Sequence, residues 1–202
     1  MNKKYLIGTV ILLLLLLVAI FVSLKPTSQK DDSQGNQEVA EGHKNTSYTI
    51  EGQSIVLTDG LSEMESAPGS ATKIATRYFG NEFKHDLNND GRDDVVFLVT
   101  QERGGSGKFF YVVAALNTPT GYTGSHAFLL GDRIAPQSVN VDEGITTQGT
   151  MRDNVIVVNY TDRKPNEPMT TSPSVGKSTW IKLDPITLQF AVVAQNFEGE
   201  SL

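Results

Sequence analysis

The chain has 202 residues, of which 39% are hydrophobic, and it contains no cysteine. Both a disulfide framework and an acylated N-terminal cysteine are therefore excluded. Its 17 basic and 23 acidic residues give a formal net charge of −6. Because residues 1–25 hold three of the basic residues and none of the acidic ones, the remainder carries −9. This balance favours solubility and cation binding, and it argues against nucleic acid as the main partner.

The N-terminus has the pattern of a membrane anchor. Residues 1–4 form a short basic start, and residues 5–24 contain no charged side chain. A helix of that length, rising about 1.5 Å per residue, spans the ~30 Å hydrocarbon core of a lipid bilayer. Lys3 and Lys4 favour a cytoplasmic N-terminus and export of the remainder. The sequence predicts an uncleaved signal anchor in the cell membrane, single-pass and with an extracytoplasmic C-terminal domain; a removed signal peptide is the alternative.

Behind the anchor, residues 25–46 are polar and hold almost no bulky apolar side chains. Such a segment buries too little apolar surface to order itself, so we expect a disordered stalk that holds the folded part off the bilayer. His43 lies within this stalk, and no partner is expected for it. The folded part then covers residues 47–195 and is followed by a C-terminal tail, residues 196–202.

The hydrophobic pattern of the folded part is that of β-strands. Short apolar or alternating runs, rich in Val, Ile, Phe, Tyr and Thr, recur between turn signals. A Gly-rich turn at 102–107 separates two long apolar runs and predicts an antiparallel hairpin in mid-sheet, with both faces covered. We therefore expect a mainly β, antiparallel sheet or sandwich-like domain preceded by a single transmembrane helix. The predicted strands are Ser54–Thr58, Lys73–Phe79, Asp94–Gln101, Lys108–Leu116, His126–Leu130, Gln137–Val141, Val155–Tyr160, Ser178–Leu183 and Thr187–Val193.

One loop carries the strongest chemical signal in the chain. Oxygen-bearing side chains stand at its positions 1, 3, 5 and 9, and hard divalent cations bind several such oxygens at once. Gly91 at position 6 allows the sharp turn that this loop needs, and the carbonyl of the residue at position 7 is a further ligand. The sequence predicts a structural Ca²⁺ site. Its ligands are Asp86, Asn88, Asp90, Arg92 and Asp94.

The residues after the loop distinguish it from an EF-hand. An EF-hand needs a bidentate Glu at position 12, where this chain has Phe97, and a β-rich run follows in place of a helix. The loop resembles the calcium loops of integrin-type FG-GAP repeats. It occurs once, which excludes a propeller of roughly four or more blades. The alternative is a metal-free Asp/Asn turn that Lys84 and Arg92 neutralise.

Several segments resemble known catalytic motifs, but none of them meets the requirements of its motif. Gly104–Lys108 resembles a phosphate loop or a nucleophile elbow, but Glu102 and Lys108 stand where these motifs require glycine. Ser174–Lys177 matches S-x-x-K in form only, because a loop is predicted where that motif opens a helix. Ser125 and His126 cannot form a nucleophile and base, since adjacent side chains point apart on a strand.

Several pieces of the chain, in their order over residues 48–195, resemble an uncharacterised domain of bacterial envelope lipoproteins and membrane-anchored proteins, sometimes found beside META domains. The resemblance implies export and a calcium-type loop, and it carries no known activity. Many such proteins have an acylated N-terminal cysteine, whose place the predicted helix takes here. The pieces are Tyr78–Asn81, Asp86–Asp94, Gly104–Gly107 before Phe110–Tyr111, Leu130–Arg133, Asn154–Val158 and Glu167–Met169.

Two classes of function fit these observations. The first is a non-enzymatic calcium-binding module that recognises an unknown envelope protein or polymer through Thr118–Ser125 or Asp162–Ser174, long polar stretches predicted as loops. The second is a cell-wall or peptide hydrolase with loop carboxylates as acid and base, for which Asp132, Asp142 and Glu143 are candidates. We expect the module and no enzyme, because none of these catalytic motifs is complete in the chain.

Overall fold

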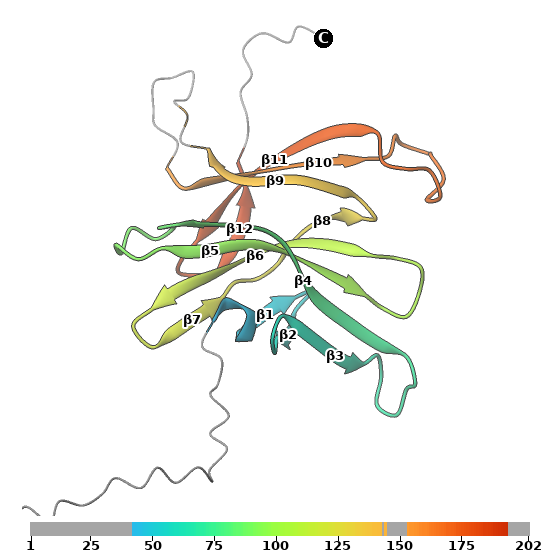
Figure 1. The fold of residues 1–202 in the computed structure, drawn as a ribbon, viewed down its shortest axis with the longest axis horizontal. Coiled ribbons are helices and arrows are strands. Elements are labelled where there is room, and N and C mark those ends of the chain that lie inside the picture. The colour runs from blue at the N-terminus through green and yellow to red at the C-terminus, as the bar shows by residue number, and fades with distance from the viewer. Residues whose placement is uncertain (1–41, 143, 145–152, 194–202) are drawn as a thin grey trace, which may run out of the picture. The chain divides into compact units, whose positions relative to one another are not determined.

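The computed structural model describes residues 42–142, 144 and 153–193. The predicted anchor at residues 5–24, the tail at 196–202 and Glu143 lie outside these ranges. No helix within them is long and apolar enough to cross a bilayer. The described part is mainly β and its sheets are antiparallel, which confirms the predicted fold class for the domain (Figure 1).

The largest sheet has six strands, paired antiparallel throughout. Five of them lie side by side in chain order, β3-β4-β5-β6-β7, and β8 pairs with β6 beyond the short β7. The long central pair, β5 and β6, is the hairpin that the Gly-rich turn predicted. These strands are β3 (Leu61–Glu65), β4 (Lys73–His85), β5 (Asp94–Glu102), β6 (Phe109–Thr118), β7 (Gly121–Gly124) and β8 (Phe128–Asp132).

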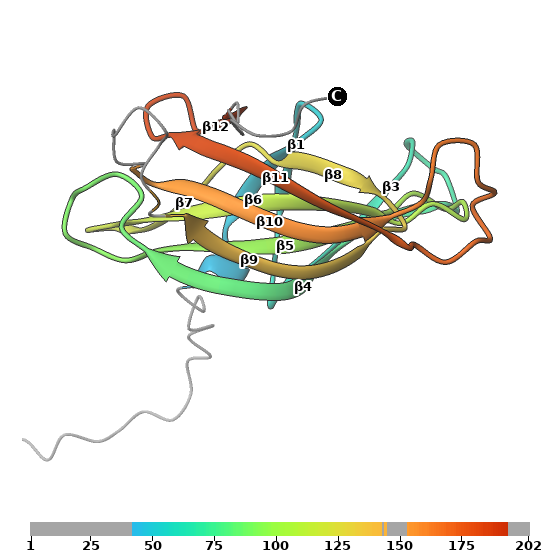
Figure 2. The ribbon, with the colours of Figure 1, turned by 90° about the horizontal axis from the view of Figure 1, so that it is seen from above.

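A second sheet of four strands, in the order β12-β11-β10-β9, covers one face of the first (Figures 1 and 2). Apolar side chains from both sheets form one continuous core, including Val96 and Leu98 from β5 and Ile156 and Ile181 from the second sheet. The two layers therefore make a sandwich held by burial of apolar surface. Its strands are β9 (Ala135–Asp142), β10 (Val155–Asp162), β11 (Val175–Asp184) and β12 (Gln189–Val192).

The opposite face of the six-stranded sheet is covered by a small hairpin, β1 (Ser47–Ile50) with β2 (Gln53–Val56). Side chains alternate between the two faces of a strand, so Phe97 of β5 joins a second core with Tyr48 and Ile55. The eight residues Asp94–Gln101 of β5 are all buried. Coverage of both faces explains why β5 and β6 are apolar without alternation, as the sequence predicted.

The loops of the sandwich gather at two opposite ends. Asp94 at the start of β5 bonds Asn117 at the end of β6, and Asn154 before β10 bonds the loop after β4, so the predicted metal loop lies at this end. At the other end, the N–H of Arg133 donates to the carbonyl of Lys108 at 2.7 Å. In Figure 2 the metal loop (green) and the β10–β11 loop (orange-red) lie at opposite ends of the sandwich.

Three strands are present where none was predicted. β1, β3 and β7 are short, and the last two carry no buried side chain, so their apolar pattern is weak. β7 corrects the interpretation of Thr118–Ser125 as a long loop, because this stretch forms a hairpin with β6. Ser125 is wholly buried, and its hydroxyl accepts a 2.8 Å hydrogen bond from the N–H of Ala114. It cannot contribute to a binding surface.

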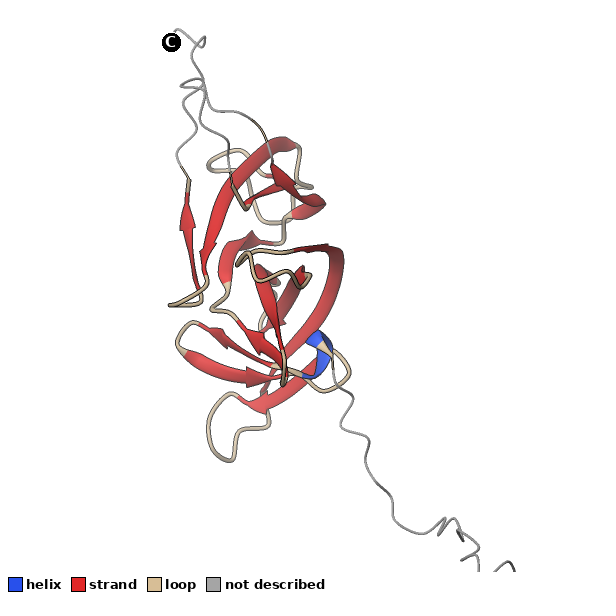
Figure 3. Ribbon diagram, turned by 90° about the vertical axis from the view of Figure 1, so that its left-hand side faces the viewer, coloured by secondary structure: helices blue, strands red, loops and turns tan. Residues whose placement is uncertain are grey.

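The boundary of the predicted stalk is also wrong. Residues 42–46 belong to the folded part, and His43–Asn45 form the one helical turn among the described residues, a 3-10 helix (Figure 3). His43 has partners: its Nε2 lies 2.9 Å from the carboxylate of Glu82, and its ring packs edge-on against Phe97 with centroids 5.2 Å apart. The Tyr48 hydroxyl donates to the carbonyl of His43. The sequence did not predict this contact, because His43 is a single residue in a segment that is otherwise polar.

Candidate metal centre

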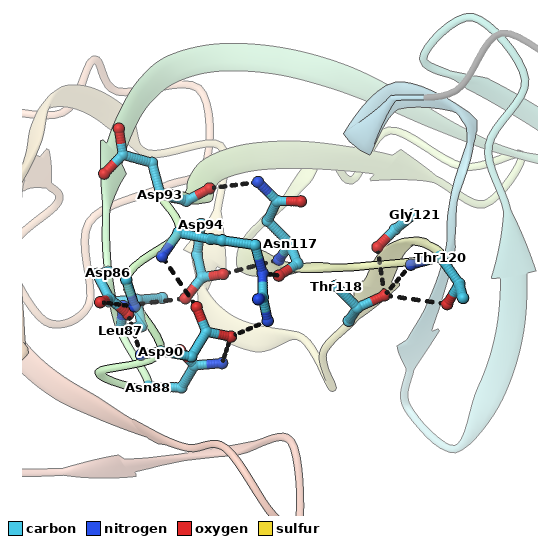
Figure 4. Close-up of polar contacts among 12 residues, drawn as sticks. Asp86, Leu87, Asn88, Asp90, Asp93, Asp94, Asn117, Thr118, Thr120 and Gly121 are labelled. Atoms are coloured by element: carbon cyan, nitrogen blue, oxygen red, sulfur yellow. Dashed lines mark hydrogen bonds and ion pairs between the residues drawn. The ribbon is translucent and has the colours of Figure 1, made fainter.

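The predicted metal loop connects β4, which ends at His85, to β5, which begins at Asp94. Two residues of the loop adopt the left-handed backbone conformation, Asn89 with φ 59° and Gly91 with φ 83°. This region favours Gly and Asn. The sequence therefore places suitable residues where the loop turns. The four predicted side-chain ligands lie on this short segment (Figure 4).

Asp86 organises the first half of the loop. Its two carboxylate oxygens accept hydrogen bonds from the N–H groups of Asp90 at 3.0 Å and Gly91 at 2.7 Å. Desolvation acts to raise the pKa of this carboxyl, but the hydrogen bonds from backbone N–H groups outweigh it and hold the pKa below its ordinary value. The carboxylate at position 1 is thus ionised and fixed in orientation.

Asp94 closes the loop from inside the protein. Its side chain is wholly buried, and its oxygens accept the N–H groups of Leu87 at 2.9 Å and Asn117 at 2.7 Å (Figure 4). Burial raises the pKa of Asp94 above its ordinary value; the two hydrogen bonds oppose this shift, and the charges of Asp86 and Asp90 add to it. The loop therefore gathers negative charge around a buried carboxylate.

Asp90 and Asn88 complete the polar set at the exposed side. The Asn88 side-chain carbonyl accepts the N–H of Asp90 at 3.1 Å, and its amide donates to the Asp90 carboxylate at 3.0 Å. Asp90 also contacts the guanidinium of Arg92 and accepts the Arg92 N–H at 3.0 Å. The Asp90 carboxylate is thus already neutralised by Arg92. This ion pair is one of the two expected if the loop is a turn that binds no metal. No ion pair of Lys84 with the loop is seen among the described residues.

The loop is anchored to both sheets. Arg92 Nε donates to the carbonyl of Asn117 at 2.7 Å, and the Asn117 amide donates to the carbonyl of Asp93 at 3.2 Å. From the second sheet, the Asn154 amide donates to the carbonyl of Leu87 at 2.9 Å. Neither Asn117 nor Asn154 was predicted as part of the site. Their sequence neighbourhoods contain no ligand pattern, and only the packing of the two sheets brings them to the loop.

Chemically, the loop offers hard oxygen donors of the kind that calcium prefers: three carboxylates, an amide oxygen and a main-chain carbonyl. These donors belong to the predicted ligands Asp86, Asn88, Asp90, Arg92 and Asp94. Among the described residues, however, no three His, Asp or Glu side chains lie close enough to hold a metal ion as they stand. The Asp90 carboxylate contacts the Arg92 guanidinium in this arrangement.

The carboxylates considered for a hydrolase lie far apart. Asp132 at the end of β8 pairs with Arg133 at 3.1 Å and accepts the N–H of Lys108 at 2.8 Å. Asp142 at the far end of β9 accepts the indole N–H of Trp180 at 3.1 Å. The eight residues of β9 separate them by roughly 20 Å or more at about 3.3 Å per residue, which is too far for an acid/base pair.

The remaining motif residues have structural partners. Ser174 precedes β11, and Lys177 lies within that strand, where a loop was predicted, and pairs with Asp162 at 2.7 Å. Gly104 has φ 78° in the turn between β5 and β6, a conformation that glycine adopts without strain. Each motif therefore has a role in the fold that requires no chemistry.

Comparisons of this chain with family models, with curated proteins and with solved structures found no match.

Proposed function

We propose that this protein is a membrane-anchored extracytoplasmic β module, non-enzymatic, that binds structural calcium and recognises a partner in the cell envelope. The observation that carries the calcium proposal is the buried Asp94 carboxylate, which shares one loop with Asp86 and Asp90. A divalent cation there would offset the mutual repulsion of these carboxylates, and burial makes that repulsion stronger than in water.

Two of the proposed ligands are already held in a fixed orientation without metal. Backbone N–H groups fix the orientation of Asp86 and Asp94, so little conformational entropy remains to be lost there on binding. Asp90 is the movable member, because it must exchange the Arg92 guanidinium for the metal. Bound calcium would replace the positive charge of the Arg92 guanidinium beside the Asp90 carboxylate. The role of the site is therefore to lock the β4–β5 connection.

A platform of this kind presents loops from a rigid sandwich. Of the two stretches predicted for partner contact, residues 163–174 form a loop. Arg163 fixes it, donating from Nε to the carbonyl of Thr171 and from Nη1 to the carbonyl of Arg133 at 2.9 Å. The exposed Met169 offers an apolar contact on this loop. Because the loop lies at the end opposite to the calcium loop, calcium would stiffen the support without touching the partner.

The location of the module rests on the sequence. Residues 5–24 are uncharged and long enough to span a bilayer, and Lys3 and Lys4 favour export of the C-terminal part. The resemblance to bacterial envelope domains agrees with this assignment. In washed membranes the full chain should resist extraction by alkaline carbonate and retain residues 1–24. Terminal sequencing that finds a mature N-terminus within residues 25–41 would overturn the anchor.

Thermal melts of the full chain in detergent test the calcium proposal. Calcium at a hundredfold excess over its dissociation constant should stabilise the domain by about 2.7 kcal/mol, and Asp90→Ala should abolish the gain. The matched control is Asp59→Gly in the turn before β3, where φ is 51° and glycine causes no backbone strain. Identical melts of the unsubstituted chain in calcium and in chelator would refute the site. Turnover of peptidoglycan, peptide or ester substrates, lost on substitution of Asp132 or Asp142, would refute the non-enzymatic assignment.

A further inference from the structure

We infer that Asn154, a residue of the second sheet, positions the calcium loop, so that metal binding and the packing of the two sheets are coupled. This inference rests on the proposed calcium site and extends it beyond the loop. Asn154 lies immediately before β10, 60 or more residues from the loop in sequence, and is 7% exposed. A buried side-chain amide must find hydrogen-bond partners, because burying an unpaired amide costs free energy.

Within the described part of the chain, the hydrogen bonds of the Asn154 side chain go to the end of β4 and to the loop. Its amide donates to the carbonyl of Leu87 at 2.9 Å and approaches the side-chain oxygen of Asn89 at 3.5 Å. Its oxygen lies 2.8 Å from Nε2 of His85. Since the amide nitrogen is directed to the Leu87 carbonyl, the oxygen must accept, and Nε2 of His85 must carry a hydrogen. The contact therefore fixes the histidine tautomer as well.

The residue that Asn154 holds is the one between two predicted ligands. Leu87 lies between Asp86 and Asn88; its N–H donates to Asp94 at 2.9 Å, and its carbonyl accepts from Asn154. Its side chain is 3% exposed and belongs to the core between the two sheets. Both polar groups of this residue and its side chain are thus fixed, which sets the directions in which the neighbouring Asp86 and Asn88 project.

Partners that orient metal ligands from outside the coordination shell contribute strongly to affinity, and their removal costs roughly 10- to 100-fold. We assign this role to Asn154. The backbone at this position is left-handed, with φ 55°, so Asn154→Gly removes the side chain without backbone strain. The matched control is Asn159→Ala, on the strand β10 that follows Asn154, which removes an amide that donates to Ser138 at 2.9 Å, away from the loop.

Isothermal titration of calcium into the full chain in detergent, well below the melting temperature, tests the assignment. Asn154→Gly should weaken calcium binding at least tenfold, whereas Asn159→Ala should leave it within twofold of the unsubstituted chain. His85→Leu should weaken binding in the same direction, and His85→Gln, whose amide can replace the Nε2–H donor, should restore it. In the unsubstituted chain, the Nε2–H resonance of His85 should shift when calcium is added.

The outcomes separate the two proposals. If the unsubstituted chain binds no calcium, the proposed function fails and the role of Asn154 fails with it. If the unsubstituted chain binds calcium and Asn154→Gly matches Asn159→Ala in affinity, the calcium site stands and the positioning role is refuted. Rescue by His85→Gln distinguishes positioning from general loss of stability, because both histidine variants remove the imidazole ring.

Discussion

The main-chain N–H of Asn117 donates a 2.7 Å hydrogen bond to the carboxylate of Asp94, across 23 residues of sequence. The bond joins the end of β6 to the start of β5, and the second oxygen of Asp94 holds the N–H of Leu87 in the loop. Asp94 therefore has a structural role that exists with or without metal. Asp90, at the exposed side of the loop, holds no such connection between strands.

This difference predicts opposite behaviour of two neighbouring carboxylates. Asp94→Ala should lower the free energy of unfolding by about 2–4 kcal/mol even in chelator, because it leaves the buried N–H of Leu87 and the partly buried N–H of Asn117 without acceptors. Asp90→Ala should cost less than about 1 kcal/mol in chelator and remove only the calcium response. Urea unfolding of both variants, with and without calcium, measures these effects. Equal losses in chelator would contradict the division of roles.

Arg92 is expected to oppose calcium binding through its side chain. Its guanidinium contacts Asp90, so the metal must displace a positive charge, although the Arg92 main-chain carbonyl is a predicted ligand. Arg92→Gln keeps that carbonyl and should tighten calcium binding by up to about fivefold, the worth of an exposed ion pair. Calcium titration measures the change.

The control for this prediction is Arg77→Gln, which removes a similar exposed arginine that pairs with Glu63 at 3.6 Å on β3 and β4. Its calcium affinity should match that of the unsubstituted chain. Weaker binding in Arg92→Gln would show that the bond from Arg92 Nε to Asn117 matters more than the competition for Asp90.

His43 should make the domain sensitive to acid. Burial lowers the pKa of His43 below its ordinary value; the adjacent Glu82 opposes the shift, and Lys44 and Lys84 add to it. The unfolded chain then binds a proton near pH 6.5 that the folded chain resists. The contribution of neutral His43 is complete above about pH 6.5 and is lost as the pH falls below that value.

His43→Gln removes this titration while leaving the other two histidines in place. Between pH 7.5 and pH 5.5, the melting temperature of the unsubstituted chain should fall further than that of the variant. Parallel curves, or a gain in stability of the unsubstituted chain on acidification, would mean that the ion pair with Glu82 prevails over burial.

Fragments for such measurements should begin before Gly42, since residues 42–46 are part of the fold.

The loop of residues 163–174 is the predicted contact with an envelope partner. Met169→Glu places a charge on its exposed apolar side chain, which is 40% exposed, and should weaken co-purification of the partner from cross-linked membranes. This substitution is preferable to deletion of Lys164–Thr171, which would remove the carbonyl that Arg163 binds. The melt and the calcium response should not change.

Ile186→Glu is the matched control, because Ile186 is 91% exposed in the β11–β12 turn at the calcium end of the sandwich. It should leave co-purification intact. Loss of the partner in Ile186→Glu, with retention in Met169→Glu, would move the binding surface to the opposite end.

The sequence by itself determined the features that depend on local order. The period of apolar residues predicted the class of fold and the central hairpin, because a strand covered on both faces must be apolar along its length. The spacing from Asp86 to Asp94 predicted a tight loop with a glycine at its turn, since that geometry is set within a few residues. Each of these signals is complete within a short window of the chain.

Tertiary structure alone decided the surroundings of these features. The contacts of Asn117 and Asn154 with the loop, and of His43 with Glu82, join residues far apart in sequence. No local period encodes such contacts, because they arise from the register of strands and the packing of one sheet on another. For the same reason the sequence allowed Asp132 and Asp142 as acid and base candidates, whereas the length of β9 separates them in the structure.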